Sequence, residues 1–170
     1  MNVVLFGFMG VGKTTVGRLL APRIGYGFVD SDAEAEKEAG MRISEVFASL
    51  GEPAFRSMER GIVQRLSAGD GQVIALGGGA LLDPLNIEHL RRSCRMVLLT
   101  ASPEEISLRT RLNSTRPLLA GEDRLGRIRR LLDERRERYL AAADMVVDTN
   151  GVPPIRVAET IHGRLEVTAP

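Results

Sequence analysis

The sequence has 170 residues, a length that suits one domain with a substantial core. Its net charge of +1 and its 26% of charged residues favour neither nucleic acid nor a membrane surface as a partner. The one cysteine, Cys94, excludes an intrachain disulfide and is typical of a reducing compartment. No apolar run is long enough to span a membrane, and the first residues lack the pattern of a secretory signal. We therefore expect a cytoplasmic protein.

Apolar runs and helical periods alternate along the chain. Five runs lack the polar alternation of a sheet that faces water on one side, which predicts strands covered on both faces, at 3–6, 27–29, 73–76, 96–99 and 145–147. Helices are expected near 14–24, 53–67, 84–92, 103–110, 123–142 and 153–165. Pro22 lies in the first of these helices and should kink or end it. The alternation predicts an α/β fold with three layers, α/β/α, around a five-stranded parallel sheet.

The stretch GFMGVGKTT, residues 7–15, has the spacing of a phosphate-binding loop. Gly7 permits a sharp turn from the strand, and the later glycines let backbone N–H groups face an anion. Lys13 is expected to reach the β- and γ-phosphates, and Thr14 to ligate Mg²⁺. A glycine-rich turn without a ligand is the weaker interpretation, because the motif is complete, follows a strand and opens a helix. The sequence therefore predicts a site for ATP or GTP with Mg²⁺.

The two commonest kinds of phosphate-loop protein fit the sequence poorly. GTPases read guanine with an Asn-Lys-x-Asp segment, which the sequence lacks. ATPase motors end an apolar strand with an acidic metal ligand, but the strand at 73–76 is followed by three glycines, 77–79. Asp148 ends the strand at 145–147, where a turn-capping role is the better interpretation. The carboxylate for Mg²⁺ must therefore come from elsewhere.

The segment VDSD, residues 29–32, is the best source of that carboxylate. Asp30 and Asp32 close an apolar strand and in extended chain project to the same side, at the edge where α/β proteins bind ligands. One carboxylate would serve the metal through water, and the other would orient or deprotonate an attacking hydroxyl. Helix capping is the alternative, with Ser31 and Glu34 as a capping box, and the two interpretations are compatible.

Arg56 lies one helical turn before Glu59, off the apolar stripe of the helix expected at 53–67. The pair is either a surface ion pair or an arginine that Glu59 orients to bind a substrate carboxylate. The glycines at 77–79 follow a buried strand directly. Three consecutive glycines cost backbone entropy, so we expect them to bring the backbone close to a ligand, with a plain loop as the alternative.

Arg135 occupies an apolar position in the helix expected at 123–142. It belongs to a stripe that steps by three and four residues along Leu125, Ile128, Leu132, Arg135 and Tyr139. A buried arginine needs an anion, whereas Arg136 and Arg138 fall off the stripe and should lie at the surface. Residues 111–123 carry turn residues without a clean period, which predicts a mobile loop. Arg116 in this loop could act on a transferring phosphoryl group, as arginine fingers do.

Taken in order, these motifs resemble those of shikimate kinases. The matching stretches are GFMGVGKTTVGRLL, FVDSDAEAE, GEPAFRSME, IALGGGALL, RPLL at 116–119 and the arginine four residues before Tyr139. The resemblance implies the fold of nucleoside-monophosphate kinases in a single domain, 1–170, with a lid at about 111–123 and a substrate-binding region at about 30–62. It also implies ATP-dependent phosphorylation of the 3-hydroxyl of shikimate, in aromatic amino-acid biosynthesis. We expect a monomer that uses ATP and Mg²⁺.

The resemblance assigns roles to individual residues. Asp32 would bind the ring hydroxyls and position the nucleophile, and Asp30 would act on Mg²⁺ through water. The substrate carboxylate would lie between Arg56 and Arg135, with backbone N–H groups offered by Gly78 and Gly79. Lys13 and Arg116 would be catalytic at the phosphates, and Arg109 and Pro154 would enclose adenine. The expected nucleotide-binding residues are Gly10, Val11, Gly12, Lys13, Thr14, Thr15, Arg109, Arg116 and Pro154.

Two rivals remain. One is another small-molecule kinase of the same architecture, for gluconate or a nucleoside monophosphate, which has no need for Arg56 and Arg135 to meet at one carboxylate. The other is an ATP-dependent switch that does not transfer phosphate to a small molecule. The arginine-rich stretch at 109–138 is compatible with RNA, but the near-neutral chain and the lack of stacking aromatics argue against it.

Overall fold

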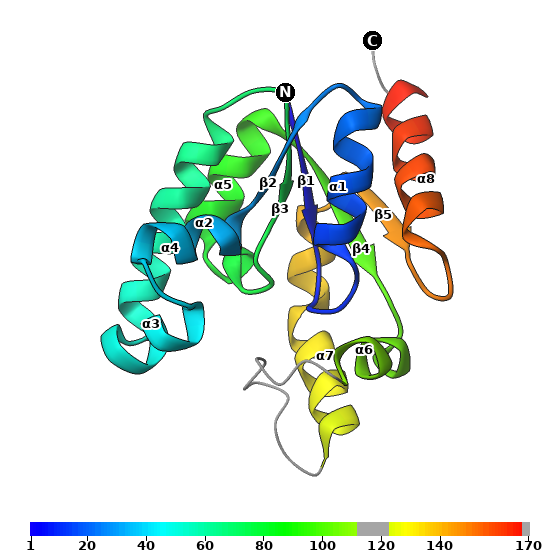
Figure 1. Cartoon of the computed structure of the whole chain (residues 1–170). Coiled ribbons are helices and arrows are strands. Elements are labelled where there is room, and N and C mark those ends of the chain that lie inside the picture. Colours follow the sequence, from blue (N-terminus) through cyan, green and yellow to red (C-terminus); the bar gives the residue numbers. More distant parts are fainter. Residues whose placement is uncertain (112–122, 168–170) are drawn as a thin grey trace.

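Within the described residues, 1–111 and 123–167 of the computed structural model, five parallel strands form one sheet in the order β2–β3–β1–β4–β5 (Figure 1). All five expected strands are present and the class is confirmed. Their bounds are β1 Asn2–Phe6, β2 Gly27–Asp30, β3 Gln72–Ala75, β4 Cys94–Thr100 and β5 Met145–Asp148. The central strand β1 pairs with β3 on one side and β4 on the other.

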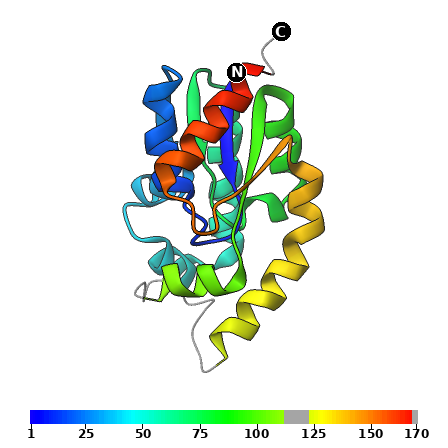
Figure 2. The same cartoon turned by 90° about the vertical axis from the view of Figure 1, so that its right-hand side faces the viewer.

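Helices cover both faces of the sheet, as the two views show (Figures 1 and 2). One face carries α1 and α8, and the opposite face carries α4 and α5. The six helices expected from the sequence are found at α1 Lys13–Arg23, α4 Glu52–Ser67, α5 Pro84–Ser93, α6 Pro103–Thr110, α7 Arg124–Ala142 and α8 Pro154–Val167. Pro22 lies in the last turn of α1, which ends one residue later, as predicted. No helix in the described part of the chain is long and apolar enough to cross a membrane.

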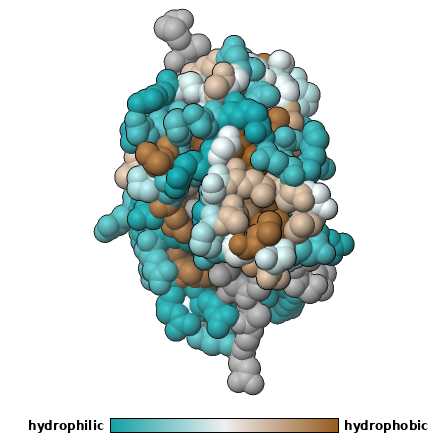
Figure 3. Space-filling view, turned by 90° about the vertical axis from the view of Figure 1, so that its left-hand side faces the viewer, coloured by the Kyte–Doolittle hydropathy of each residue, from teal (hydrophilic) through white to brown (hydrophobic). Residues whose placement is uncertain are grey.

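Three helical segments were not predicted: α2 Ser31–Ala39, α3 Ile43–Leu50 and the 3-10 turn η1 Ala80–Leu82. The helices α2 and α3 pack on α4, at the rim of the sheet, and bury little. Only Ser31 and Ala35 are buried in α2, and Leu50 in α3 is 56% exposed. Figure 3, which views this side, shows a mostly hydrophilic surface with hydrophobic residues in several places, the largest group of them right of the centre. The sequence of α2 therefore carries little helical period, whereas α3 places Ile43, Val46, Phe47 and Leu50 on one face but is too short, at 8 residues, for that pattern to stand out.

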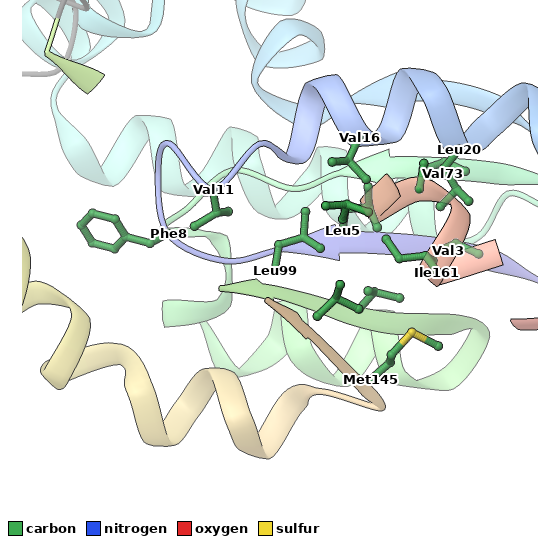
Figure 4. Packing of buried hydrophobic residues seen from close by; sticks show 14 of the residues in the cluster. Val3, Leu5, Phe8, Val11, Val16, Leu20, Val73, Leu99, Met145 and Ile161 are labelled. Carbon is green, nitrogen blue, oxygen red and sulfur yellow. The ribbon is translucent and has the colours of Figure 1, made fainter. Parts of the chain in front are cut away.

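The core lies on both faces of the sheet. Successive side chains of a strand point to opposite faces, so Val3 and Leu5 of β1 join the cluster under α1 and α8, while Val4 and Phe6 join the cluster under α4 and α5. Figure 4 shows the first cluster, with Leu5 packed among residues of α1, β3 and β4. Each such side chain stabilises the fold by about 1.5–3 kcal/mol when fully buried. This burial on both faces explains why the inner strands β1, β3 and β4 lack polar alternation. The edge strands β2 and β5 are covered less completely than expected, and Val146 of β5 is 43% exposed.

Candidate active site

The phosphate-binding loop connects the end of β1 to the start of α1. Gly12 caps α1 in the left-handed conformation, with φ of 100°, and Gly7 has φ of 138°. Side chains rarely adopt these angles, and a Cβ at Gly7 would overlap the carbonyl oxygen of Leu99. Lys13 donates from Nζ to the carbonyls of Gly7 and Phe8, at 3.0 and 2.9 Å. The loop thus holds the Lys13 ammonium at the helix N-terminus, where an anion binds best.

A cavity of about 200 Å³ opens beside this loop, at the carboxyl ends of the central strands. This is the edge at which parallel α/β sheets bind ligands. The cavity brings together the loop, both aspartates and the glycine run, which lie far apart in the sequence. Val11, expected among the nucleotide-binding residues, buries its side chain in the core, so only its backbone is available to a ligand. The lining residues are Gly10, Gly12, Lys13, Thr14, Thr15, Asp30, Asp32, Ala75, Leu76 and Gly78.

Thr14 and Asp30 form the pair expected to serve a metal. The Thr14 hydroxyl donates to Oδ2 of Asp30 at 2.7 Å, so both oxygens face one point at the cavity wall. Two oxygen ligands suit Mg²⁺, which keeps several waters and phosphate oxygens and needs few protein groups. In the described ranges, no cluster of three or more acidic, histidine or cysteine side chains offers a fuller cage. The residues present therefore fit Mg²⁺ bound together with a nucleotide.

Asp30 also caps α2, which corrects the expected capping box. Its Oδ1 accepts from the N–H groups of Asp32 and Ala33, at 3.0 and 3.4 Å. Ser31 is turned inward instead, and its hydroxyl accepts from the N–H of Gly77 at 2.8 Å. Asp30 can cap the helix because it is the last residue of β2 and keeps an extended backbone, whereas Ser31 is already helical. The oxygen that caps α2, Oδ1, is thus not the one that accepts from Thr14, Oδ2.

Asp32 lies in the first turn of α2, and not in extended chain as expected. The cavity nevertheless receives its carboxylate, because the helix begins at the edge of the sheet. Gly77 passes so close that a Cβ there would overlap Oδ1 of Asp32. The glycine run therefore makes room for this side chain as well as for any ligand.

Arg56 on α4 is held by two glutamates. Its Nη1 donates to Oε2 of Glu59 at 2.8 Å, and its Nη2 lies 3.4 Å from Oε1 of Glu52. Glu59 is only 5% exposed, and burial raises the pKa of its carboxyl against the opposing effect of Arg56. A surface ion pair would leave both partners in water. The pair is instead an arginine with a fixed direction, anchored by a buried carboxylate.

The guanidinium of Arg56 occupies the space beside Gly79. A Cβ at this glycine would lie 2.8 Å from both Nη atoms of Arg56. The backbone of Gly79 is otherwise ordinary, with φ of −97°. Glycine is therefore required at position 79 because the Arg56 guanidinium leaves no space for a side chain, and not because of the backbone conformation. The glycines were expected to make room for a ligand, but Gly79 also makes room for Arg56.

Gly79→Ala is accordingly expected to displace Arg56 while leaving the fold intact, because the crowded atoms are the end of a flexible side chain. We expect the KM for the substrate that carries the carboxylate to rise about tenfold, the size of one lost charged hydrogen bond. Steady-state kinetics and a thermal melt measure the two effects. Gly61→Ala on α4 is the matched control, because a Cβ there meets nothing within 4 Å. An unchanged KM in Gly79→Ala would contradict the expectation.

Arg135 on α7 is 8% exposed, as its place on the apolar stripe predicted. Its Nη1 donates to the carbonyl of Gly78 at 3.2 Å, and its guanidinium carbon lies 5.5 Å from the ring centroid of Phe8. Among the described residues it makes no ion pair. Arg136 and Arg138 are exposed, as predicted. A buried guanidinium that no described carboxylate pairs with is a natural receptor for a substrate carboxylate.

Arg109 ties the phosphate loop to the segment between β5 and α8. Its Nη2 donates to the Thr149 carbonyl at 2.7 Å, and its Nη1 donates to the Thr149 hydroxyl at 3.0 Å. The same Nη1 lies 3.4 Å from the carbonyls of Gly10 and Val11. Pro154 follows as the first residue of α8 and is exposed. Arg109 thus lies beside the phosphate loop, where the base of a nucleotide bound by that loop could reach it.

Part of the expected site lies outside the described residues, and three side chains that contact the site were not predicted. Arg116 and residues 112–122 of the expected lid lie outside the described residues. Three side chains bond the backbone or the arginine of the site: Ser31 at Gly77, Thr149 at Arg109 and Tyr139 at Gly78. No sequence pattern predicted these contacts. Tyr139 donates to the Gly78 carbonyl at 2.5 Å, and its i+4 spacing from Arg135 was the one available signal.

A phosphate loop, an adjacent hydroxyl–carboxylate pair, a second aspartate and two arginines define a P-loop kinase that phosphorylates a small anionic molecule. Comparison with known proteins names the family. The model of the shikimate kinase family matches residues 9–166. A curated shikimate kinase from Symbiobacterium thermophilum is 49% identical over 152 residues, which cover 88% of this chain and 87% of that protein. The chain therefore belongs to the shikimate kinase family, and it is an ATP-dependent kinase.

Solved structures agree with this assignment. A shikimate kinase from Acinetobacter baumannii, in complex with shikimate, has a TM-score of 0.93 and 36% identity, over 98% of this chain and 93% of that one. A gluconokinase from Sinorhizobium meliloti 1021 has a TM-score of 0.55 and 18% identity, over 96% and 92% of the two chains. The second likeness shows the shared P-loop kinase fold alone. The gluconate alternative is therefore not favoured.

Proposed function

We propose that this kinase transfers the γ-phosphate of ATP to the 3-hydroxyl of shikimate, giving shikimate 3-phosphate and ADP for aromatic amino-acid biosynthesis. One observation carries the proposal. Asp32, Arg56 and Arg135, from three different helices, converge on the glycine run at 77–79 beside the phosphate loop. A ring that bears hydroxyls and one carboxylate matches this set of an acceptor and two guanidinium groups.

The substrate carboxylate would lie between Arg56 and Arg135. Both guanidinium groups border the same short backbone, Arg56 at Gly79 and Arg135 at Gly78. The N–H groups of these two glycines donate to no acceptor within the described residues, which leaves them for the substrate. Asp32 would accept hydrogen bonds from the ring hydroxyls and orient the 3-hydroxyl, or take its proton.

The nucleotide phosphates would lie in the loop of residues 7–15. Lys13 would exchange its two carbonyl partners for phosphate oxygens, and the backbone N–H groups and the positive end of α1 would add to the attraction. Thr14 and Asp30 would hold Mg²⁺, which when bound neutralises phosphate charge. Catalysis would rest on positioning and electrostatics, with little covalent work by the protein.

The remaining assignments complete the proposal. Arg109 and Pro154 would enclose adenine, and the backbone from Gly10 to Thr15 would bind the phosphates. Arg116, in a lid at about 111–123, would act on the transferring phosphoryl group. We infer a single domain that works as a cytoplasmic monomer. A free, buried Cys94 accords with a reducing compartment.

The decisive experiment measures ADP release from Mg²⁺-ATP by the purified chain. We expect shikimate to raise the rate by orders of magnitude, because the acceptor hydroxyl completes the site, and gluconate or nucleoside monophosphates to raise it hardly at all. Equal stimulation by gluconate would favour the rival kinase. Slow hydrolysis that no acceptor accelerates would favour the ATP-dependent switch.

A further inference from the structure

Tyr139 lies on α7 one helical turn after Arg135, outside the side chains that the proposed function uses. It is one of two tyrosines in the chain and is 5% exposed. Its ring meets that of Phe6 edge-on, with centroids 5.9 Å apart and planes at 79°. Phe6 is the last residue of β1, directly before the phosphate loop. Core packing therefore fixes where the Tyr139 hydroxyl lies.

The hydroxyl donates to the carbonyl oxygen of Gly78 at 2.5 Å. Nη1 of Arg135 donates to the same oxygen at 3.2 Å, so both lone pairs of this carbonyl are used by α7. Burial raises the pKa of Tyr139, which keeps the hydroxyl protonated and a donor. Of the two donors, Tyr139 makes the shorter bond from the stiffer side chain.

The peptide between Gly78 and Gly79 has no side chain that could fix its direction. In a planar trans peptide, the N–H of Gly79 points opposite to the carbonyl of Gly78, and the described residues contain no cis peptide. Holding the carbonyl on α7 therefore turns the Gly79 N–H away from α7. That N–H has no acceptor among the described residues, and Gly79 borders the guanidinium of Arg56.

We propose that Tyr139 is a positioning residue for substrate binding: its hydroxyl fixes the Gly78–Gly79 peptide so that the Gly79 N–H faces the substrate beside Arg56. The inference rests on the proposed function, in which these N–H groups bind substrate. Arg135 alone would hold the peptide less firmly, because its bond to the Gly78 carbonyl is longer, at 3.2 Å, and in that function the same flexible side chain also binds the carboxylate. A rigid second donor keeps the peptide in place while Arg135 adjusts to its ligand.

Tyr139→Phe removes the hydroxyl and keeps the ring against Phe6. We expect the shikimate KM, and its Kd by calorimetry, to rise about fivefold, the size of one net hydrogen bond. The KM for ATP should stay within about twofold, and Tm within about 2 °C, because the packing of the ring is unchanged. In the presence of saturating shikimate, to which these N–H groups would be bonded, hydrogen exchange at Gly78 and Gly79 should be faster than in the wild type, which reports the loosened peptide independently of kinetics.

Tyr26→Phe is the matched control. Tyr26 is the other tyrosine, packs against the cluster under α1 and α8, and lies away from the glycine run, so none of these quantities should change. An unchanged shikimate KM and Kd in Tyr139→Phe would overturn the inference. So would a parallel rise of both KM values with a large loss of Tm, which indicates a structural role only. A wild-type chain that shikimate does not stimulate would instead overturn the proposed function, so the two failures are distinguishable.

Discussion

Asp32→Asn is expected to lower kcat for shikimate phosphorylation by about 10²- to 10⁴-fold, the usual contribution of a general base or an orienting carboxylate. The amide keeps the shape of the side chain and can still accept one hydrogen bond, but it carries no charge and takes no proton. The KM for ATP should change little, because the nucleotide contacts proposed here come from the phosphate loop, Asp30 and α1. Steady-state kinetics with each substrate varied in turn measures this split.

Asp133→Asn provides the control for the charge change. Asp133 is an exposed residue of α7, so its substitution removes one negative charge without touching the cavity. A loss of kcat in both variants would point to net charge, and an unchanged kcat in Asp32→Asn would remove Asp32 from the chemistry. Because Asp32 also lies against Gly77, a thermal melt should accompany the kinetics to show that the glycine run keeps its place.

Arg135→Ala is expected to raise the shikimate KM by about 100-fold, which corresponds to the loss of a buried, charge-assisted contact with a carboxylate. The KM for ATP should rise far less, because Arg135 meets the phosphate loop at the ring of Phe8, which is buried and is not among the expected nucleotide-binding residues. The Gly78 carbonyl keeps Tyr139 as a donor, so the glycine run should stay in place. Initial rates over a wide range of shikimate concentration test this expectation.

Arg136→Ala is the matched control, since Arg136 is the next residue of the same helix and is exposed. Arg136→Ala removes the same charge from α7 at a residue outside the site. We therefore expect the KM values for shikimate and ATP to stay near those of the wild type. If Arg135→Ala raised the KM for ATP more than the KM for shikimate, Arg135 would belong to the nucleotide site and not to the substrate site.

The sheet could be predicted from the sequence because its inner strands, β1, β3 and β4, are buried on both faces. Such strands must be apolar throughout, and runs such as Val73–Ala75 reveal themselves without reference to the rest of the chain. The helices α4, α5 and α8, which lie on the sheet, carry a helical period because one face of each is buried. The helix α2 buries only Ser31 and Ala35 and has little period, whereas α3 has an apolar stripe at Ile43, Val46, Phe47 and Leu50 but spans only 8 residues.

Some features of the site could likewise be predicted from the sequence, and others could not. The phosphate loop is contiguous, so its spacing alone indicates what it binds, and Arg135 is conspicuous because it interrupts an apolar stripe. The sequence left open whether VDSD caps a helix, through Ser31 and Glu34, or supplies carboxylates to the site. In the structure Asp30 is the cap, through Oδ1, while its Oδ2 accepts from the Thr14 hydroxyl beside the phosphate loop. The sequence likewise left Arg56 between a surface pair and a fixed arginine, and the burial of Glu59 decides for the second.

The sequence by itself determined the α/β class, the phosphate loop, the family resemblance and the residues brought to the site. Each of these can be recognised within a short stretch of sequence, because periodicity, motif spacing and continuous apolar runs depend only on neighbouring residues. Only the tertiary structure decided how those residues meet: Arg56 against Gly79, Asp32 against Gly77, and Tyr139 and Arg135 on one carbonyl of Gly78. Such contacts join elements dozens of residues apart, and their distances follow from the packing of α4 and α7 around the sheet and from no local pattern.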